Sequence, residues 1–144
     1  HVINIKFYRR GEPLKLSKVI PPLEHLGLNV AQEATYDVTP GDGVAPCSVH
    51  DFRTEESLGR AVDTGAVRKN VEEALAAIFS GRTEDDGFNA LVISAGLNWR
   101  EAWLLRAAAK YLLQAGIPFS LGYIEQTLSK NPAIARALIA AFHA

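Results

Sequence analysis

The sequence predicts an α+β fold in which a small β-α-β-β unit precedes a segment made of helices. Three observations carry this prediction. Apolar and polar residues alternate in three stretches of the first half, which is the period of a half-buried strand. A stretch between the first two of these has helical spacing, and from Val67 onward the spacing is helical throughout. Glycine and proline mark most of the boundaries between these stretches.

The first strand is expected at Val2–Tyr8, because the odd-numbered residues after Val2 are apolar and the even-numbered ones are polar or amphipathic. A turn containing glycine and proline follows at 9–13. We expect the hydroxyl of Ser17 to cap the next helix, and Gly27 to end that helix in the left-handed conformation. The unit thus opens as strand, turn and helix.

A second strand is expected at Leu28–Val38 and a shorter third strand at Cys47–Arg53, with a glycine- and proline-rich loop between them. Alternation along the second strand places these residues on one side: Leu28, Val30, Ala34, Tyr36 and Val38. Residues 55–65 are charged and poor in periodic apolar positions, so we interpret them as a linker. The sequence therefore predicts two domains, residues 1–66 and 67–144.

The second domain is expected to consist of helices separated by glycine and proline. They are predicted from Val67 to a terminator at Gly81, over Gly87–Ala95, over Trp99–Ala115, after a capping Ser120, and from Pro132 at the first position of the last helix. Asn98 and Glu101 have the spacing of a capping box.

The helix at Trp99–Ala115 is apolar nearly all round. Beyond its first turn the polar residues are Arg106, Lys110 and Gln114, which form one narrow stripe. We expect such a helix to be buried on several sides, either as the central element of the helical domain or inside a larger assembly.

The composition argues against several classes of partner. A formal net charge of -1 gives no positive electrostatic potential that would attract nucleic acid. No uninterrupted apolar stretch is as long as a membrane-spanning helix, which needs about 20 residues. The single cysteine, Cys47, suits a reducing compartment, so we expect the cytoplasm. The chain begins at His1 and contains no methionine, so we interpret it as a piece of a longer polypeptide.

No catalytic, metal or cofactor-binding constellation is recognised in the sequence. Its histidines lack the spacing of paired metal ligands, and both common phosphate-binding glycine motifs are missing. Cys47 and His50 should point to opposite faces of one strand and cannot act as nucleophile and base. We interpret His50 and Asp51 as ordinary strand residues, and the acids of 84–86 as favouring the dipole of the following helix.

The turn between the first strand and the first helix is the candidate ligand site. Arg9, Arg10, Gly11 and Glu12 stand where backbone N–H groups and a helix start can face a small anion, such as the carboxylate of an amino acid. The alternative is a solvated turn with two surface arginines.

A helix-turn-helix is the alternative functional hypothesis. The two helices around Gly116 are joined by a short connection, as in DNA-binding or adaptor modules. The second of them, residues 121–130, offers Lys130 at its far end and an acidic Glu125, which is a poor set for contacts with phosphates and bases.

Two runs of sequence resemble a known family. The run KFYRRGEPLKLSKVIPPLEHLGLNV, Lys6–Val30, and the longer run DDGFNALVISAGLNWREAWLLRAAAKYLLQAGIPFSLGYIEQTLSKNPAIARAL, Asp85–Leu138, are similar to the ACT-like segment and the following helical segment of large NAD-dependent glutamate dehydrogenases. The resemblance implies an incomplete ferredoxin-like, ACT-like β-α-β-β unit that lacks its last strand, followed by a helical subdomain.

The same resemblance implies a role without catalysis. The parent enzyme would oxidise L-glutamate to 2-oxoglutarate and ammonia with NAD, while this segment would precede the catalytic domain and hold no cofactor. We therefore expect a regulatory or assembly module that contacts other domains of its own polypeptide and further subunits of a homo-oligomer, with an amino acid as effector and with neither nucleic acid nor membrane as partner. The incomplete sheet leaves an edge for another segment or subunit to cover.

Overall fold

The computed structural model describes residues 2–56 and 64–144. Its elements in chain order are β1 (Val2–Arg10), α1 (Leu16–His25), β2 (Leu28–Val38), β3 (Cys47–Glu56), α2 (Thr64–Phe79), the 3-10 helix η1 (Gly87–Asn89), α3 (Ala90–Ser94), α4 (Trp99–Gln114), α5 (Leu121–Lys130) and α6 (Pro132–His143). The linker prediction fails at both ends, because Glu55 and Glu56 belong to β3 and α2 begins at Thr64; its middle, 57–63, lies outside the described residues.

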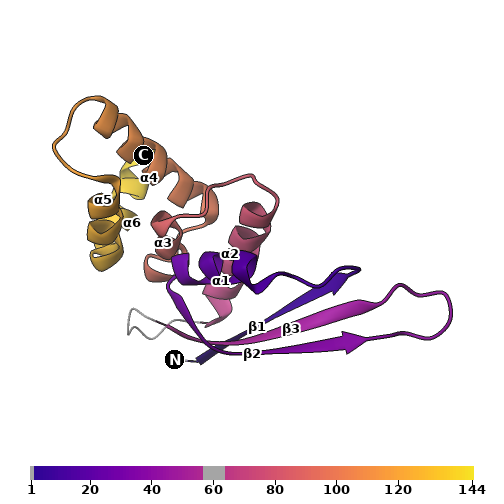
Figure 1. Cartoon of the computed structure of the whole chain (residues 1–144). Coiled ribbons are helices and arrows are strands. Elements are labelled where there is room, and N and C mark those ends of the chain that lie inside the picture. The colour runs from indigo at the N-terminus through magenta and orange to yellow at the C-terminus, as the bar shows by residue number, and fades with distance from the viewer. Residues whose placement is uncertain (1, 57–63) are drawn as a thin grey trace.

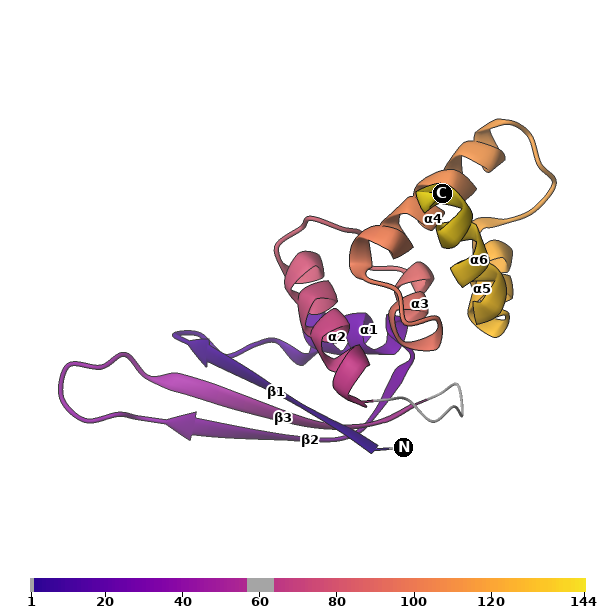
Figure 2. The ribbon, with the colours of Figure 1, turned by 180° about the vertical axis from the view of Figure 1, so that it is seen from behind.

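The three strands form one antiparallel sheet in the order β1-β3-β2. Helices α1 and α2 lie on one face of this sheet, and the remaining helices continue beyond its end (Figures 1 and 2). In the described part of the chain the opposite face is uncovered (Figure 2). The architecture confirms the predicted α+β class, with a β-α-β-β unit followed by helices.

The main core lies between the sheet and its helices. It consists of fully or nearly fully buried apolar residues: Val19, Leu23, Leu26, Leu28, Phe52, Val71, Ala74, Leu75, Val92, Ile93 and Ala102. Because Val92 and Ile93 belong to α3 and Ala102 to α4, this core joins the sheet to the helices that follow. A second core holds the helical end together: Phe88, Leu91, Ala95, Leu97, Leu105, Ala109, Leu128, Ala135 and Ile139.

A β-bulge changes the side to which β2 directs its residues. The register with β3 shifts between Val30 and Gln32, so Val30 stands opposite Thr54 whereas Glu33 stands opposite Phe52. One extra residue in a strand reverses the alternation that follows. The predicted single apolar side of β2 is therefore wrong beyond Val30, and Tyr36 lies on the uncovered face, where it is 56% exposed.

The ends of several helices follow their local signals. Gly27 and Gly81 have φ of 86° and 72°, which confirms them as left-handed terminators, and Gly96, with φ of 66°, follows α3 in the same conformation. Asn98 accepts from the N–H of Glu101 at 3.0 Å and the Glu101 carboxylate accepts from the N–H of Asn98 at 3.0 Å, so the capping box is confirmed.

The cap of α1 differs from the prediction. The helix begins at Leu16, its cap position is the extended Lys15, and Ser17 lies inside the first turn. The N–H of Lys18 donates to the carbonyl of Lys15, so the first turn of the helix closes two residues earlier than a cap at Ser17 would place it. The prediction that Ser17 caps α1 is therefore wrong.

Helix α4 also differs from expectation. Its Arg106, predicted to lie in a polar stripe, is 1% exposed, whereas Trp103 and Tyr111 are 48% and 69% exposed. Within this chain α4 is covered along one side, on Ala102, Leu105 and Ala109. The expectation of a central helix covered on several sides by the helical domain is thus wrong; burial inside a larger assembly stays a prediction.

The buried guanidinium of Arg106 is surrounded by hydrogen-bond acceptors from the segment that leads into η1 and from η1 itself. Its Nε and Nη2 donate to the two carboxylate oxygens of Asp86 at 2.7 Å each. The guanidinium also donates to Thr83 Oγ1 at 3.0 Å and to Asn89 Oδ1 at 2.9 Å, and it lies 5.7 Å from the ring centre of Phe88. A bidentate pair with two further acceptors satisfies a buried guanidinium.

The acids of 84–86 each have a different partner. Glu84 accepts from Lys110 at 2.7 Å, and this hydrogen bond lowers the pKa of Glu84. Asp85 pairs with His25 of α1 at 2.7 Å, while Asp86 holds Arg106. Burial, and then the Asp86 carboxylate, raise the pKa of Glu125 in α5. Through these pairs the segment before η1 ties together α1 and α4.

Within residues 2–56 and 64–144, no helix is both long and apolar enough to cross a membrane.

Candidate functional site

The turn between β1 and α1 is held to the sheet at two points. Gly11, with φ of 83°, donates its N–H to the carbonyl of Pro46 at 3.0 Å, which ties the turn to the loop that precedes β3. Leu14 donates its N–H to Nε2 of His50 at 3.2 Å. The turn is therefore fixed by the backbone of one neighbour and by the side chain of another.

His50 is the side chain of the sheet that holds this turn. It lies in β3, is 2% exposed, stacks on Phe52 at 6.5 Å between ring centres, and has Nδ1 at 3.0 Å from Thr35 Oγ1. Because Nε2 accepts from Leu14, it carries no proton, so Nδ1 is the protonated nitrogen and donates to Thr35. Strand alternation predicts its place on the inner face, but no local pattern marks its hydrogen bond with Leu14, which lies 36 residues away in the chain.

Beside this turn lies an open hollow of about 770 Å³. The residues that line it are Phe7, Tyr8, Arg9, Glu12, Pro13, Leu14, Lys15, Lys18, Val19 and Phe79. Of the four residues predicted for the site, Arg9 and Glu12 line the hollow, whereas Arg10 and Gly11 do not. Arg10 stands opposite Cys47 in the sheet, on the side away from the helices.

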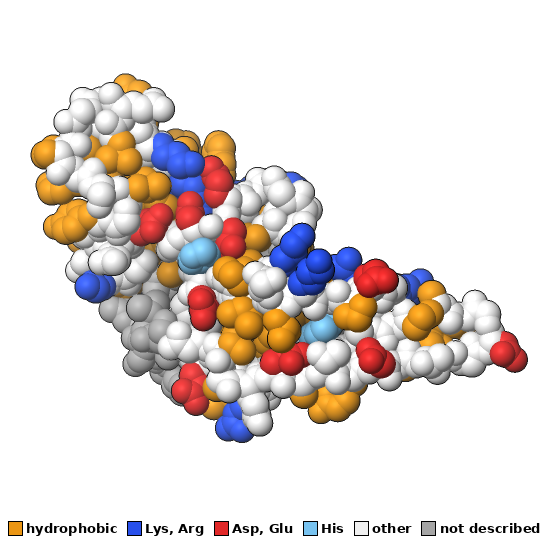
Figure 3. All heavy atoms as spheres, in the orientation of Figure 1, with side chains coloured by type: hydrophobic (Ala, Val, Ile, Leu, Met, Phe, Trp, Pro, Cys, Tyr) orange, Lys and Arg blue, Asp and Glu red, His pale blue; other side chains and the backbone are white. Residues whose placement is uncertain are grey.

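Two lysines that the prediction did not include, Lys15 and Lys18, join Arg9 at the hollow. Basic side chains gather at the start of α1 and the nearby end of β1 (Figure 3). Lys18 lies three residues after the cap residue Lys15, so the first turn of α1 brings the two side chains to the same side of the helix.

The lining combines charge of both signs with an apolar floor. Arg9, Lys15 and Lys18 can pair with a carboxylate, and Glu12 can accept from an ammonium group. Phe7, Val19 and Phe79 supply the apolar part, and Phe7 and Phe79 meet edge to face at 5.7 Å. Such a lining matches the chemistry of a free amino acid.

Cys47 and His50, also singled out from the sequence, are not among the residues that line this hollow. Cys47 and His50 occupy alternate sides of β3, with His50 on the buried side, as expected. Over the two described ranges, no three side chains among histidine, cysteine, aspartate and glutamate gather as a metal site.

Family models match both halves of the chain. One described as "Glutamate dehydrogenase, ACT3 domain" matches residues 1–67. Another, described as "Glutamate dehydrogenase, helical motif 3", matches residues 83–144. The two matches follow each other in the order of the sheet unit and the helical end.

Curated relatives align with nearly the whole chain. The NAD-specific glutamate dehydrogenase of Halomonas elongata is 39% identical over 140 residues, 97% of this chain. Those of Pseudomonas aeruginosa and Mycobacterium tuberculosis are 40% and 38% identical over 97% and 99% of it. The chain spans 9% of the length of each relative. The chain thus belongs to the NAD-specific glutamate dehydrogenase family, in which it corresponds to the ACT3 domain and helical motif 3.

Proposed function

We propose that this chain is a non-catalytic regulatory and assembly module of a large NAD-dependent glutamate dehydrogenase. The parent protein would convert L-glutamate, water and NAD to 2-oxoglutarate, ammonia and NADH at a site outside these residues. Support comes from the names of the relatives and from the small share of their length that the chain spans.

The assembly role rests above all on one observation, the apolar surface of the helical end. On α6 the residues Ile134, Leu138 and Phe142 follow each other at four-residue spacing and are 51%, 48% and 64% exposed. Hydrophobic side chains lie open on this part of the molecule (Figure 3). Stable soluble surfaces seldom present such stripes unless another surface covers them. We assign α6, with the exposed side of α4, to contacts with other domains of the polypeptide or with further subunits.

Substitution on α6 tests the assembly role. Leu138→Asp in the full-length dehydrogenase should shift the enzyme to smaller species or separate this region from its neighbours, because a carboxylate in an apolar contact is costly. Sedimentation velocity and limited proteolysis would measure this. Ala137→Asp, on the same helix and exposed but outside the stripe, is the matched control. Equal behaviour of both variants and the unaltered enzyme would contradict the assembly role.

The regulatory role rests on the hollow beside the β1–α1 turn. We propose that it holds a free amino acid, with the carboxylate at Arg9 and Lys18 and the ammonium group at Glu12. This assignment keeps Arg9 and Glu12 of the four residues suggested by the sequence and adds the two lysines, because those side chains line the hollow.

Calorimetry with free L-amino acids tests this site. We expect at least one to bind the chain at millimolar concentration, and Arg9→Gln to weaken its binding by about tenfold, the value of one charge-assisted hydrogen bond. Arg10→Gln removes the same charge outside the hollow and should leave binding within about twofold, since exposed charges contribute little. Absence of heat with every amino acid, or equal loss in both variants, would refute the site.

Helix α5 is poorly suited to the alternative role as a recognition helix of a helix-turn-helix. Helix α5 carries a single basic residue, Lys130, and its Glu125 lies against Gly87, so this helix packs on η1 instead of offering a free basic face.

A further inference from the structure

The two edges of the sheet are built differently. On the β2 edge a bulge interrupts the ladder and the acids Glu33 and Asp37 follow it. On the other edge β1 pairs with β3 residue for residue from Val2 to Arg10. Bulges and charges are the devices with which proteins protect open edges, and the one lysine at the centre of β1, Lys6, is paired to Asp51 at 3.3 Å. The β1 edge is thus the one suited to accept another strand.

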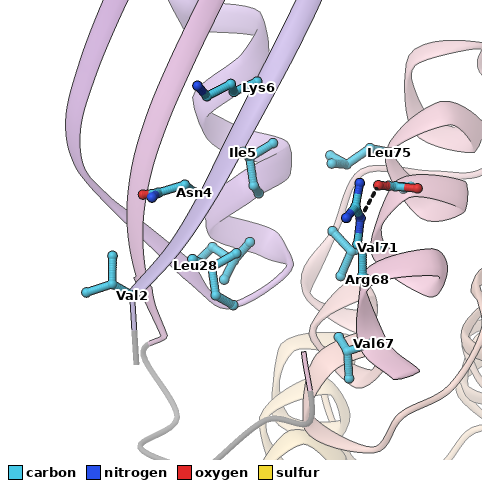
Figure 4. A pocket seen from close by; sticks show the side chains of 11 residues that line it. Val2, Asn4, Ile5, Lys6, Leu28, Val67, Arg68, Val71 and Leu75 are labelled. Carbon is cyan, nitrogen blue, oxygen red and sulfur yellow. Dashed lines mark hydrogen bonds and ion pairs between the residues drawn. The ribbon is translucent and has the colours of Figure 1, made fainter. Parts of the chain in front are cut away.

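A groove of about 460 Å³ runs between β1 and α2 at this edge. In Figure 4 Ile5 of β1 and Leu28 lie across an open space from Val67, Val71 and Leu75 of α2, whereas Val2 and Asn4 point away from that helix. Ile3, Ile5 and Val67 are half-buried although they pack against the main core. The core therefore stops short at the β1 edge, and side chains of one more strand would complete it.

The order of elements indicates where that strand would run. Strand β3 and the following helix α2 form the first two parts of a β-α-β connection. Such a connection is right-handed and would return beside β1, parallel to β3 and antiparallel to β1. Here the chain continues from α2 into η1 and α3, so residues 2–56 and 64–144 contribute no strand at this place in the sheet.

We propose that an extended segment of the same polypeptide, outside these 144 residues, adds to β1 as an antiparallel fourth strand. This rests on the proposed role as a module of a longer protein. The relatives offer ample chain for it, because the aligned part is 9% of their length. The added strand inserts apolar side chains between β1 and α2 and directs at least one carboxylate towards the basic end of β1.

Charge decides against a second copy of β1 as the occupant. β1 carries Lys6, Arg9 and Arg10 and has no acidic residue. Pairing two copies of β1 would place like charges side by side, which destabilises a sheet. A strand with carboxylates would instead compensate them.

Amide hydrogen exchange of the full-length dehydrogenase tests the proposal. In an open three-stranded sheet every second N–H of β1 bonds to β3 and the others face solvent. If a strand is added, all N–H groups between Ile3 and Tyr8 should be protected, with the edge-facing ones about a hundredfold slower than unprotected amides. Fast exchange at alternate residues of β1 in the full-length protein would overturn the proposal, whatever its oligomeric state.

A pair of variants on α2 locates the effect in the groove. Val67→Glu should accelerate exchange of the edge-facing amides of β1 about tenfold or more, because Val67 lines the groove. Ala66→Glu adds the same charge at an exposed neighbour and should change nothing. The β1 amides that bond to β3 serve as the folding control in both. Equal exchange in the two variants would contradict the assignment.

Cross-linking separates the sources of the strand. Carbodiimide coupling of Lys6 to an acidic residue elsewhere in the same polypeptide supports the proposal, and the coupling of Lys6 to Asp51 is the internal control. A Lys6–Lys6 product between two chains, obtained with an amine-reactive reagent, would assign the edge to a second copy and overturn it. Assembly of the Leu138→Asp variant reports on the module role separately, so the two failures are distinguishable.

Discussion

Replacing Arg106 with methionine should lower the free energy of unfolding of the chain by about 3 to 5 kcal/mol, the usual cost of removing one partner from a buried ion pair. Methionine fills much of the volume but donates no hydrogen bond. Asp86, Thr83 and Asn89 would then keep their acceptor atoms near a side chain that offers them nothing. Asp86 is affected most, because its carboxylate accepts from Arg106 twice.

Chemical denaturation followed by circular dichroism measures this loss. Lys110→Met is the matched control: it stands one turn further along α4, pairs with Glu84 at 2.7 Å and is about half exposed. An exposed ion pair contributes about 0 to 1 kcal/mol, so this variant should differ little from the unaltered chain. Similar losses for Arg106→Met and Lys110→Met would show that burial of the guanidinium is not what stabilises the helical end.

Replacing Phe52 with alanine should cost about 3 to 5 kcal/mol, as expected for a large aromatic side chain removed from a core. Phe52 is fully buried in the middle of β3, and its ring meets that of Phe7 edge to face at 5.7 Å. It belongs to the cluster that α1 and α2 share with the sheet, so its loss leaves a cavity that both helices line. The strand also loses the ring on which His50 stacks.

Thermal or denaturant unfolding again provides the measurement. Tyr36→Ala, on the uncovered face of the neighbouring strand, removes an aromatic ring of similar size from a position that is 56% exposed. Its expected effect is within about 0.5 to 1 kcal/mol. A loss in Tyr36→Ala comparable to that in Phe52→Ala would mean that the bare face of the sheet is covered, and it would contradict a main core confined to the face that α1 and α2 cover.

The sequence was most informative where the signal is local. Gly27 and Gly96 follow the ends of their helices because glycine adopts the left-handed conformation without the steric strain of a Cβ atom. Asn98 and Glu101 form a capping box within four residues. Alternation along β1 likewise places Ile3 and Ile5 towards the helices. These interactions need nothing from distant parts of the chain, so residue type and spacing suffice to predict them.

Features that depend on distant partners were not predictable in the same way. Arg106 has the spacing of a solvated stripe on α4, and only the acceptors contributed by residues 83–89 make its burial favourable. The bulge in β2 inserts a residue that no composition signal marks, and it moves Tyr36 to the bare face. Lys18 lines the candidate hollow because α1 begins at Leu16, which places Lys18 in the first turn of the helix. The predicted cap at Ser17 would have started the helix two residues later.

The open β1 edge has a consequence for synthesis of the full protein. A ribosome adds about 5 to 20 residues per second, so a strand encoded several hundred residues downstream would arrive tens of seconds after this sheet emerges. A strand encoded upstream would be waiting when β1 forms. Pulse-labelled nascent chains that end after residue 144 would therefore be prone to aggregation in the first case and stable in the second, since the edge offers unpaired backbone groups beside an apolar groove. The order of segments along the gene would then decide how long this edge needs a chaperone.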